Sequence, residues 1–153
     1  MKLFSGQNRV VLEWLSRRVD FDLAPSTYLL WAADVEGGPI LGAMGFGGLM
    51  GKSLGSISIA LENPQAGRPL MRAAARLFFG GYGIRGAYIS IPARRTEWIA
   101  SLKQVIGFQE VDRIKEGFAP GVDLITFKLT PETCRPWQAD LRKMTRMQAR
   151  EVA

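Results

Sequence analysis

The stretch 57-ISIALENPQAGRPLM-71 decides how the chain folds. Apolar and small residues alternate from Ser56 to Leu61, which is typical of a β-strand with one buried face. A helix is expected from Arg68-Pro69, because proline suits the first helical turn and apolar residues follow at helical spacing. With a further strand at 87–91, this unit predicts a right-handed parallel crossover. We therefore expect an α/β fold with a mixed central sheet flanked by helices.

The loop inside this stretch is predicted to hold an anion. The first N–H groups of a helix lack intrahelical partners and carry the positive end of its dipole. Gly67 allows the backbone to approach a ligand closely. Arg68, Arg72 and Arg76 follow at i, i+4 and i+8, where one helix face could touch a second phosphate. The alternative is an ordinary connection followed by a solvated arginine face.

The flanking sequence supplies the other expected elements. A helix is predicted over 7–18, with Ser5 or Asn8 as its cap. Strands are predicted over 26–38 and 39–51, each bounded by glycine-rich segments. Further along the chain we expect a helix over 96–106, strands over 110–117 and 122–130, and a charged helical tail. The prediction is one domain over 1–130 followed by a basic tail over 131–153.

The composition limits the chemistry that this chain can perform. Its 153 residues suit one domain with a sizeable core. It has no histidine, which removes the commonest general base and metal ligand. Cys134 is the only cysteine, so we expect no metal site and no internal disulfide. We find no signal peptide and no apolar run of ~20 residues, and therefore expect a cytoplasmic protein without a membrane partner.

The excess positive charge of +6 lies in the window 64–103. Outside this window, thirteen basic residues balance thirteen acidic ones. Such a patch suggests phosphate, a nucleotide or nucleic acid as the partner. Solvated helix faces are the alternative. Inside the window one acid, Glu97, stands against seven basic residues: Arg68, Arg72, Arg76, Arg85, Arg94, Arg95 and Lys103.

The order of elements over residues 8–130 resembles the GNAT superfamily of acyl-CoA-dependent N-acyltransferases. Its diphosphate loop, [Q/R]-x-x-G-x-[G/A] before a Leu-Leu pair, is similar to the segment before Leu70-Met71, with Gly67 at the final small position. The stretch 96-TEWIASLKQVIGF-108 resembles the family pattern N-x-x-A-x-x-L-Y-x-x-x-G-F. Thr96 stands at the asparagine position, and Lys103 stands where the family has its tyrosine.

The resemblance implies an acetyl-CoA or other acyl-CoA cofactor and transfer of the acyl group to an unidentified amine, on a small molecule or a protein. The resemblance makes Glu62 the candidate base that accepts the proton of the amine. It makes Lys103 the candidate acid that protonates the departing thiolate. Two alternatives stay open. One is an inactive GNAT-like interaction or virion protein of a tailed phage, located in the host cytoplasm or the virion. The other is a phage nucleobase-modifying protein on the same fold. The cofactor-binding residues implied are Ala60, Leu61, Glu62, Gln65, Ala66, Gly67, Arg68, Pro69, Leu70, Arg72 and Thr96.

Overall fold

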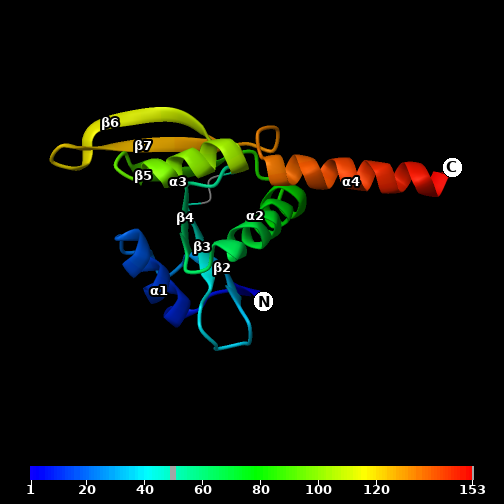
Figure 1. Cartoon of the computed structure of the whole chain (residues 1–153), viewed down its shortest axis with the longest axis horizontal. Helices are drawn as coiled ribbons and strands as arrows, with labels where there is room; N and C mark the ends of the chain where they lie inside the picture. Colours follow the sequence, from blue (N-terminus) through cyan, green and yellow to red (C-terminus); the bar gives the residue numbers. More distant parts are fainter. Residues whose placement is uncertain (49–50, 153) are drawn as a thin grey trace.

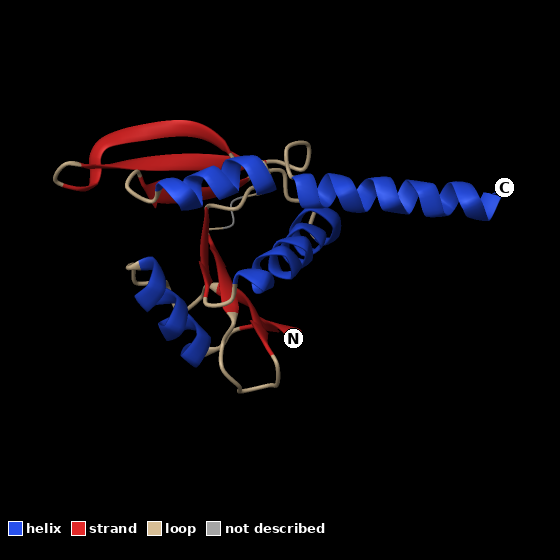
Figure 2. Ribbon diagram, viewed as in Figure 1, coloured by secondary structure: helices blue, strands red, loops and turns tan. Residues whose placement is uncertain are grey.

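The computed structural model describes residues 1–48 and 51–152, which form two antiparallel sheets with helices packed around them (Figures 1 and 2). The strands are β1 (Lys2–Gly6), β2 (Tyr28–Ala33), β3 (Gly42–Gly47), β4 (Ser56–Leu61), β5 (Ala87–Pro92), β6 (Gln109–Ala119) and β7 (Val122–Leu129). The first sheet has the order β1-β2-β3-β4 and the second the order β5-β7-β6. The α/β fold class is therefore confirmed.

The central sheet is divided between β4 and β5. These neighbouring strands are joined by a parallel bridge between Ser53 and Gly86, just before each strand begins. The Leu54 N–H also donates to the Gly86 carbonyl oxygen at 2.7 Å. The predicted parallel direction is thus observed at this point, but the ladder does not continue, and β4 and β5 belong to separate sheets.

Two helices cover opposite faces of the first sheet. Alternate residues of a strand point to opposite faces, so Leu29 packs with α1 (Arg9–Val19) and Leu30 packs with α2 (Gly67–Ala75). A 3₁₀ turn (Pro64–Ala66) precedes α2, and a π-helical turn (Arg76–Gly81) follows it. Because helices cover both faces of this sheet, β2 and β3 are nearly continuous apolar runs in the sequence.

Local signals in the sequence account for several helix ends. Asn8 caps α1, as predicted, by accepting a hydrogen bond from the Val11 N–H at 3.1 Å. The predicted helix over 96–106 consists of α3 (Thr96–Ser101) and a π-helical turn (Leu102–Ile106). Gly107 ends it with a φ of 104°, a left-handed conformation that favours glycine. Phe108 is buried immediately afterwards, where β6 begins.

The strand predictions need several adjustments, since β2 covers only Tyr28–Ala33 of the strand predicted over 26–38, and β6 extends to Ala119. We did not predict β1, which lies at the edge of the first sheet and pairs antiparallel with β2. The strand predicted over 39–51 is shorter, since β3 ends at Gly47, and residues 49–50 lie outside the described part of the chain.

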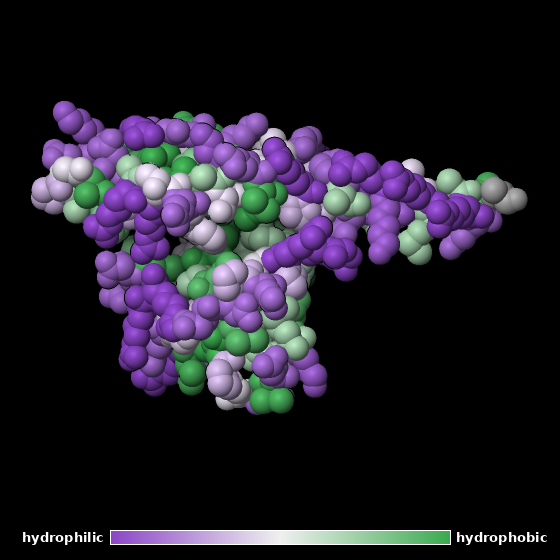
Figure 3. Space-filling view, viewed as in Figure 1, coloured by the Kyte–Doolittle hydropathy of each residue, from purple (hydrophilic) through white to green (hydrophobic). Residues whose placement is uncertain are grey.

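The final helix, α4 (Arg135–Val152), is anchored at its base and projects away from the rest of the molecule (Figure 1). Trp137 packs edge-on against Phe79, with ring centroids 6.3 Å apart. Asp140 is buried. From residue 142 to 152 every side chain is exposed, and hydrophilic side chains cover most of this segment (Figure 3).

Candidate active-site groove

The divergence of β4 and β5 leaves a groove between the two sheets. A narrow slot of about 50 Å³ lies between the strands, and a cavity of about 720 Å³ lies beyond it, past the ends of β4 and β5. Ile59, Arg95 and Trp98 line both spaces, so we treat the slot and the cavity as one feature, the β4–β5 groove. The slot is also lined by Val19, Ile57, Ser58, Ile89, Ser90, Ile91 and Pro92, and the cavity by Arg18, Ala60, Leu61, Pro64, Arg94, Thr96 and Glu97.

The backbone amides at the corner between β4 and α2 are already hydrogen-bonded within the chain. The Glu62 and Asn63 N–H groups both donate to the Leu41 carbonyl oxygen, at 3.0 and 2.9 Å. The Gln65 N–H donates to the side chain of Asn63 at 2.9 Å, and the next two N–H groups donate to backbone oxygens of the same turn. Because proline at position 64 has no N–H, every donor from 62 to 67 is used. The unpaired amides predicted to face a ligand are therefore not found among residues 62–67.

Side chains also fill the inner side of this corner. A Cβ at Gly67 would lie 2.9 Å from a methyl group of Leu61, and a Cβ at Gly42 would lie 2.8 Å from the other one. Leu61 is thus held between two glycines. Ala66 and Leu70, both predicted cofactor contacts, are 0% and 1% exposed and belong to the core. The glycine at 67 therefore makes room for a leucine of the same chain.

Two of the three arginines predicted for a second phosphate bind the final helix instead. Arg72 Nη2 and Arg76 Nε donate to the two carboxylate oxygens of Asp140, at 2.7 and 2.8 Å. Hydrogen bonds from Arg76 and Arg72 hold the pKa of Asp140 below its ordinary value of 3.8, against the effect of burial. The helix face predicted to meet phosphate is therefore engaged with α4, and Arg68 alone of the three stays outside these ion pairs.

Glu62, the candidate base, lies beside the groove in an ion pair. Its carboxylate accepts a hydrogen bond from Arg18 Nη2 at 2.7 Å. The Arg18 guanidinium also stacks over the Trp14 ring, 3.8 Å from its centroid. Arg18 lines the cavity, so this pair places the Glu62 carboxylate next to the cavity wall.

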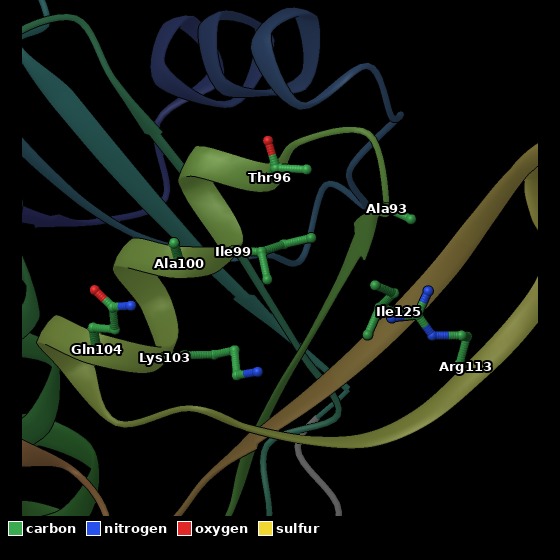
Figure 4. A pocket seen from close by; sticks show the side chains of 8 residues that line it. All are labelled: Ala93, Thr96, Ile99, Ala100, Lys103, Gln104, Arg113 and Ile125. Carbon is green, nitrogen blue, oxygen red and sulfur yellow. The ribbon is translucent and has the colours of Figure 1, made fainter.

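Lys103, the candidate acid, lines a different hollow from the groove. This second space has a volume of about 330 Å³ and lies between α3 and the strands β6 and β7. Figure 4 shows the Lys103 side chain pointing from the helix into this space, with Arg113 and Ile125 on the strands across from it. Thr96 lines both the hollow and the groove. The structure therefore does not bring Lys103 together with Glu62.

Of the predicted cofactor residues, the structure places Ala60, Leu61 and Thr96 in the wall of the groove. Gln65 is exposed and Pro69 half-buried, and neither lines it. Sequence reasoning missed Arg94 and Arg95, which it treated only as part of a charge excess. Their position in the sequence could have indicated them, because the two arginines follow a strand that ends at proline and precede a helix. Other groove residues that were missed are Arg18, Ser58, Pro64, Ser90 and Trp98.

The basic window 64–103 does not form a single surface. Arg72 and Arg76 bind Asp140, whereas Arg94 and Arg95 line the groove. Among the described residues, no group of three histidine, cysteine or acidic side chains gathers as a candidate metal site. Within the same part of the chain, no helix combines the length and the apolar character that crossing a membrane requires.

Solved structures show that this is the fold of GNAT acetyltransferases. A protein from Desulfovibrio desulfuricans assigned to that family has a TM-score of 0.64 at 13% identity, over 84% of this chain and 98% of that one. A mutant form of the spermidine N-acetyltransferase of Vibrio cholerae has a TM-score of 0.65 at 11% identity, over 85% and 95%. A Salmonella typhimurium protein assigned as an acetyltransferase, solved with its cofactor acetyl-CoA, has a TM-score of 0.62 at 12% identity, over 85% and 93%. No protein-family model and no curated protein matches the sequence.

Proposed function

We propose that the protein is an acyl-CoA-dependent N-acyltransferase and that the β4–β5 groove holds the acyl-CoA. The observation that carries the proposal is the continuity of a narrow slot between two strands with a wide cavity that contains arginines. A thin acyl-pantetheine arm suits the slot, and an anionic nucleotide suits the cavity. The fold supports the proposal, since its solved neighbours include acetyltransferases and one structure with acetyl-CoA.

In this proposal, catalysis consists mainly in positioning an amine against the thioester. Correct orientation of two reactants contributes more to the rate than a single proton transfer does. The proposed proton acceptor is Glu62, directly or through water, since its carboxylate pairs with Arg18, which lines the cavity. If Glu62 accepted the proton, its ion pair with Arg18 would weaken. Deprotonation of the amine would therefore loosen a contact at the edge of the groove.

The proposal does not require an acid at position 103. A cysteine thiol has a pKa of about 8.5. A thiolate is weakly basic compared with an alkoxide, so the thiolate of CoA can leave without prior protonation. We therefore propose that Lys103 has a role apart from the chemical step, in agreement with its position in the separate hollow. The proposed acceptor is an amine on a small molecule or a protein.

The first test is thermal unfolding with and without acetyl-CoA. A ligand at 100 times its Kd stabilises by about 2.7 kcal/mol, which raises the Tm by roughly 5–10 °C for a chain of this size. Release of CoA thiol over a panel of amines, followed with a disulfide reagent, then tests transfer. The single cysteine is buried, so the native protein adds little background. The absence of any shift would refute the proposal and favour a GNAT-like interaction protein.

A variant without the Glu62 carboxylate tests whether Glu62 takes part in the chemical step or in binding of the cofactor. Glu62→Gln should lower kcat about 10²-fold or more while the Kd for acetyl-CoA stays within about threefold. An unchanged kcat would remove Glu62 from the proposed mechanism and leave cofactor binding in place.

A further inference from the structure

The corner between β4 and α2 offers no free backbone N–H from residue 62 to residue 67 for the phosphate that the sequence predicts there. Its N–H groups from 62 to 67 are spent on oxygens of Leu41, Asn63 and Pro64. A phosphate there would have to displace these bonds, including the pair that attaches the corner to Leu41. If the groove binds an anionic cofactor, its positive partners must come from other groups.

Arg94 and Arg95 are the available cations in the cavity wall. Among the residues that the structure describes, neither takes part in an ion pair. Arg18, the third arginine of the wall, is engaged with Glu62 and Trp14. The Arg94 guanidinium lies 4.9 Å from the centroid of the Phe118 ring. This stacking holds its long side chain in place and leaves its N–H donors available to a ligand.

We propose that the phosphates of the nucleotide portion are recognised by the guanidinium groups of Arg94 and Arg95, in place of the backbone amides between β4 and α2. The inference rests on the proposed function of the groove. Guanidinium groups bind phosphate oxygens with two parallel N–H···O bonds, so they supply both charge and geometry. Glu97 lies in the same cavity wall, and its carboxylate opposes an anion there.

Binding of CoA and of pantetheine, its phosphate-free fragment, tests the inference by calorimetry. Arg94→Gln and Arg95→Gln should each weaken CoA binding by about 10- to 100-fold, the usual effect of losing a hydrogen bond to a charged group. The Kd for pantetheine should stay within about twofold in both variants. Pantetheine binding also reports that the variants are folded. Glu97→Gln should tighten CoA binding and leave pantetheine binding unchanged.

Two further variants complete the design. Arg142→Gln removes an exposed arginine from the projecting part of α4 and should change neither Kd. Arg68→Gln removes the arginine predicted at the corner. If Arg68→Gln weakens CoA binding, and Arg94→Gln and Arg95→Gln do not, the phosphates bind at the corner and the inference is overturned.

The outcomes separate the inference from the proposed function. If CoA binds the wild-type protein and both groove-arginine variants with equal affinity, the inference fails while the cofactor assignment survives. If neither CoA nor pantetheine binds the wild-type protein, the proposed function and the inference fail together. A loss of pantetheine affinity equal to the loss of CoA affinity would show that the arginines shape the groove and do not recognise phosphate.

Discussion

The contact that orients α4 allows a quantitative prediction. Asp140 is 5% exposed and receives hydrogen bonds from Arg72 and Arg76. Asp140→Asn keeps the size of the side chain but turns an amide toward the two guanidinium groups. Hydrogen bonds to charged groups contribute about 1.5–3 kcal/mol each, and the arginine side chains are 40% and 60% exposed, which screens them. We expect a net loss of about 2 kcal/mol, or roughly 4–8 °C in Tm.

The pH dependence of this loss identifies its cause. The folded-state pKa of Asp140 lies below its ordinary value of 3.8, so the carboxylate adds stability above 3.8, and this is lost as the pH falls through the folded-state pKa. Urea unfolding at about pH 7 should show the full deficit of the variant, and the deficit should shrink below pH 3.8. Glu151→Gln, on the exposed part of the same helix, is the control and should change little. A deficit independent of pH would refute the electrostatic explanation.

Further expectations follow from four single positions. Gly107→Ala should cost about 2 kcal/mol or more in urea unfolding, because φ is 104° and a Cβ would overlap a backbone carbonyl oxygen. Gly121 has a φ of 73° with open space around it, so Gly121→Ala should cost only about 1 kcal/mol. Equal losses of stability in Gly107→Ala and Gly121→Ala would exclude the steric explanation. Burial raises the pKa of the Cys134 thiol to about 11, so iodoacetamide at about pH 8 should label the unfolded chain and spare the native protein, and equal labelling rates would contradict this. Gly67→Ala should displace Leu61 into the groove and weaken acetyl-CoA binding with little change in Tm, and unaltered affinity would argue against this packing.

The parts of the fold that depend on local signals were predictable. The helical segment from Thr96 to Ile106 matches its predicted bounds, since apolar residues at helical spacing mark its buried face and Gly107 marks its end. The strand β1 was missed because its partner, β2, is separated from it by the whole of α1. A short edge strand with mostly exposed side chains leaves little trace in local sequence.

The candidate site was predictable in position more than in chemistry. The strand–loop–helix pattern predicted a binding site at the end of β4, and the structure has Ala60 and Leu61 in the wall of the cavity there. It could not reveal that the loop amides bond to Leu41, because that contact depends on how β3 and β4 pair. The pair between Arg18 and Glu62 joins residues 44 positions apart, and no local pattern indicates it.

β4 and β5 diverge from the bridge between Ser53 and Gly86, so the groove is narrow between the strands and wide beyond their ends. From Ser56 to Leu61, β4 rises roughly 16 Å at about 3.3 Å per residue. A rotation of the first sheet by about 5° relative to the second would therefore move the end of β4 by roughly 1.4 Å and change the width of the groove there. Substitutions at this narrow end should thus change how thick a molecule the wide end accepts, without touching that molecule.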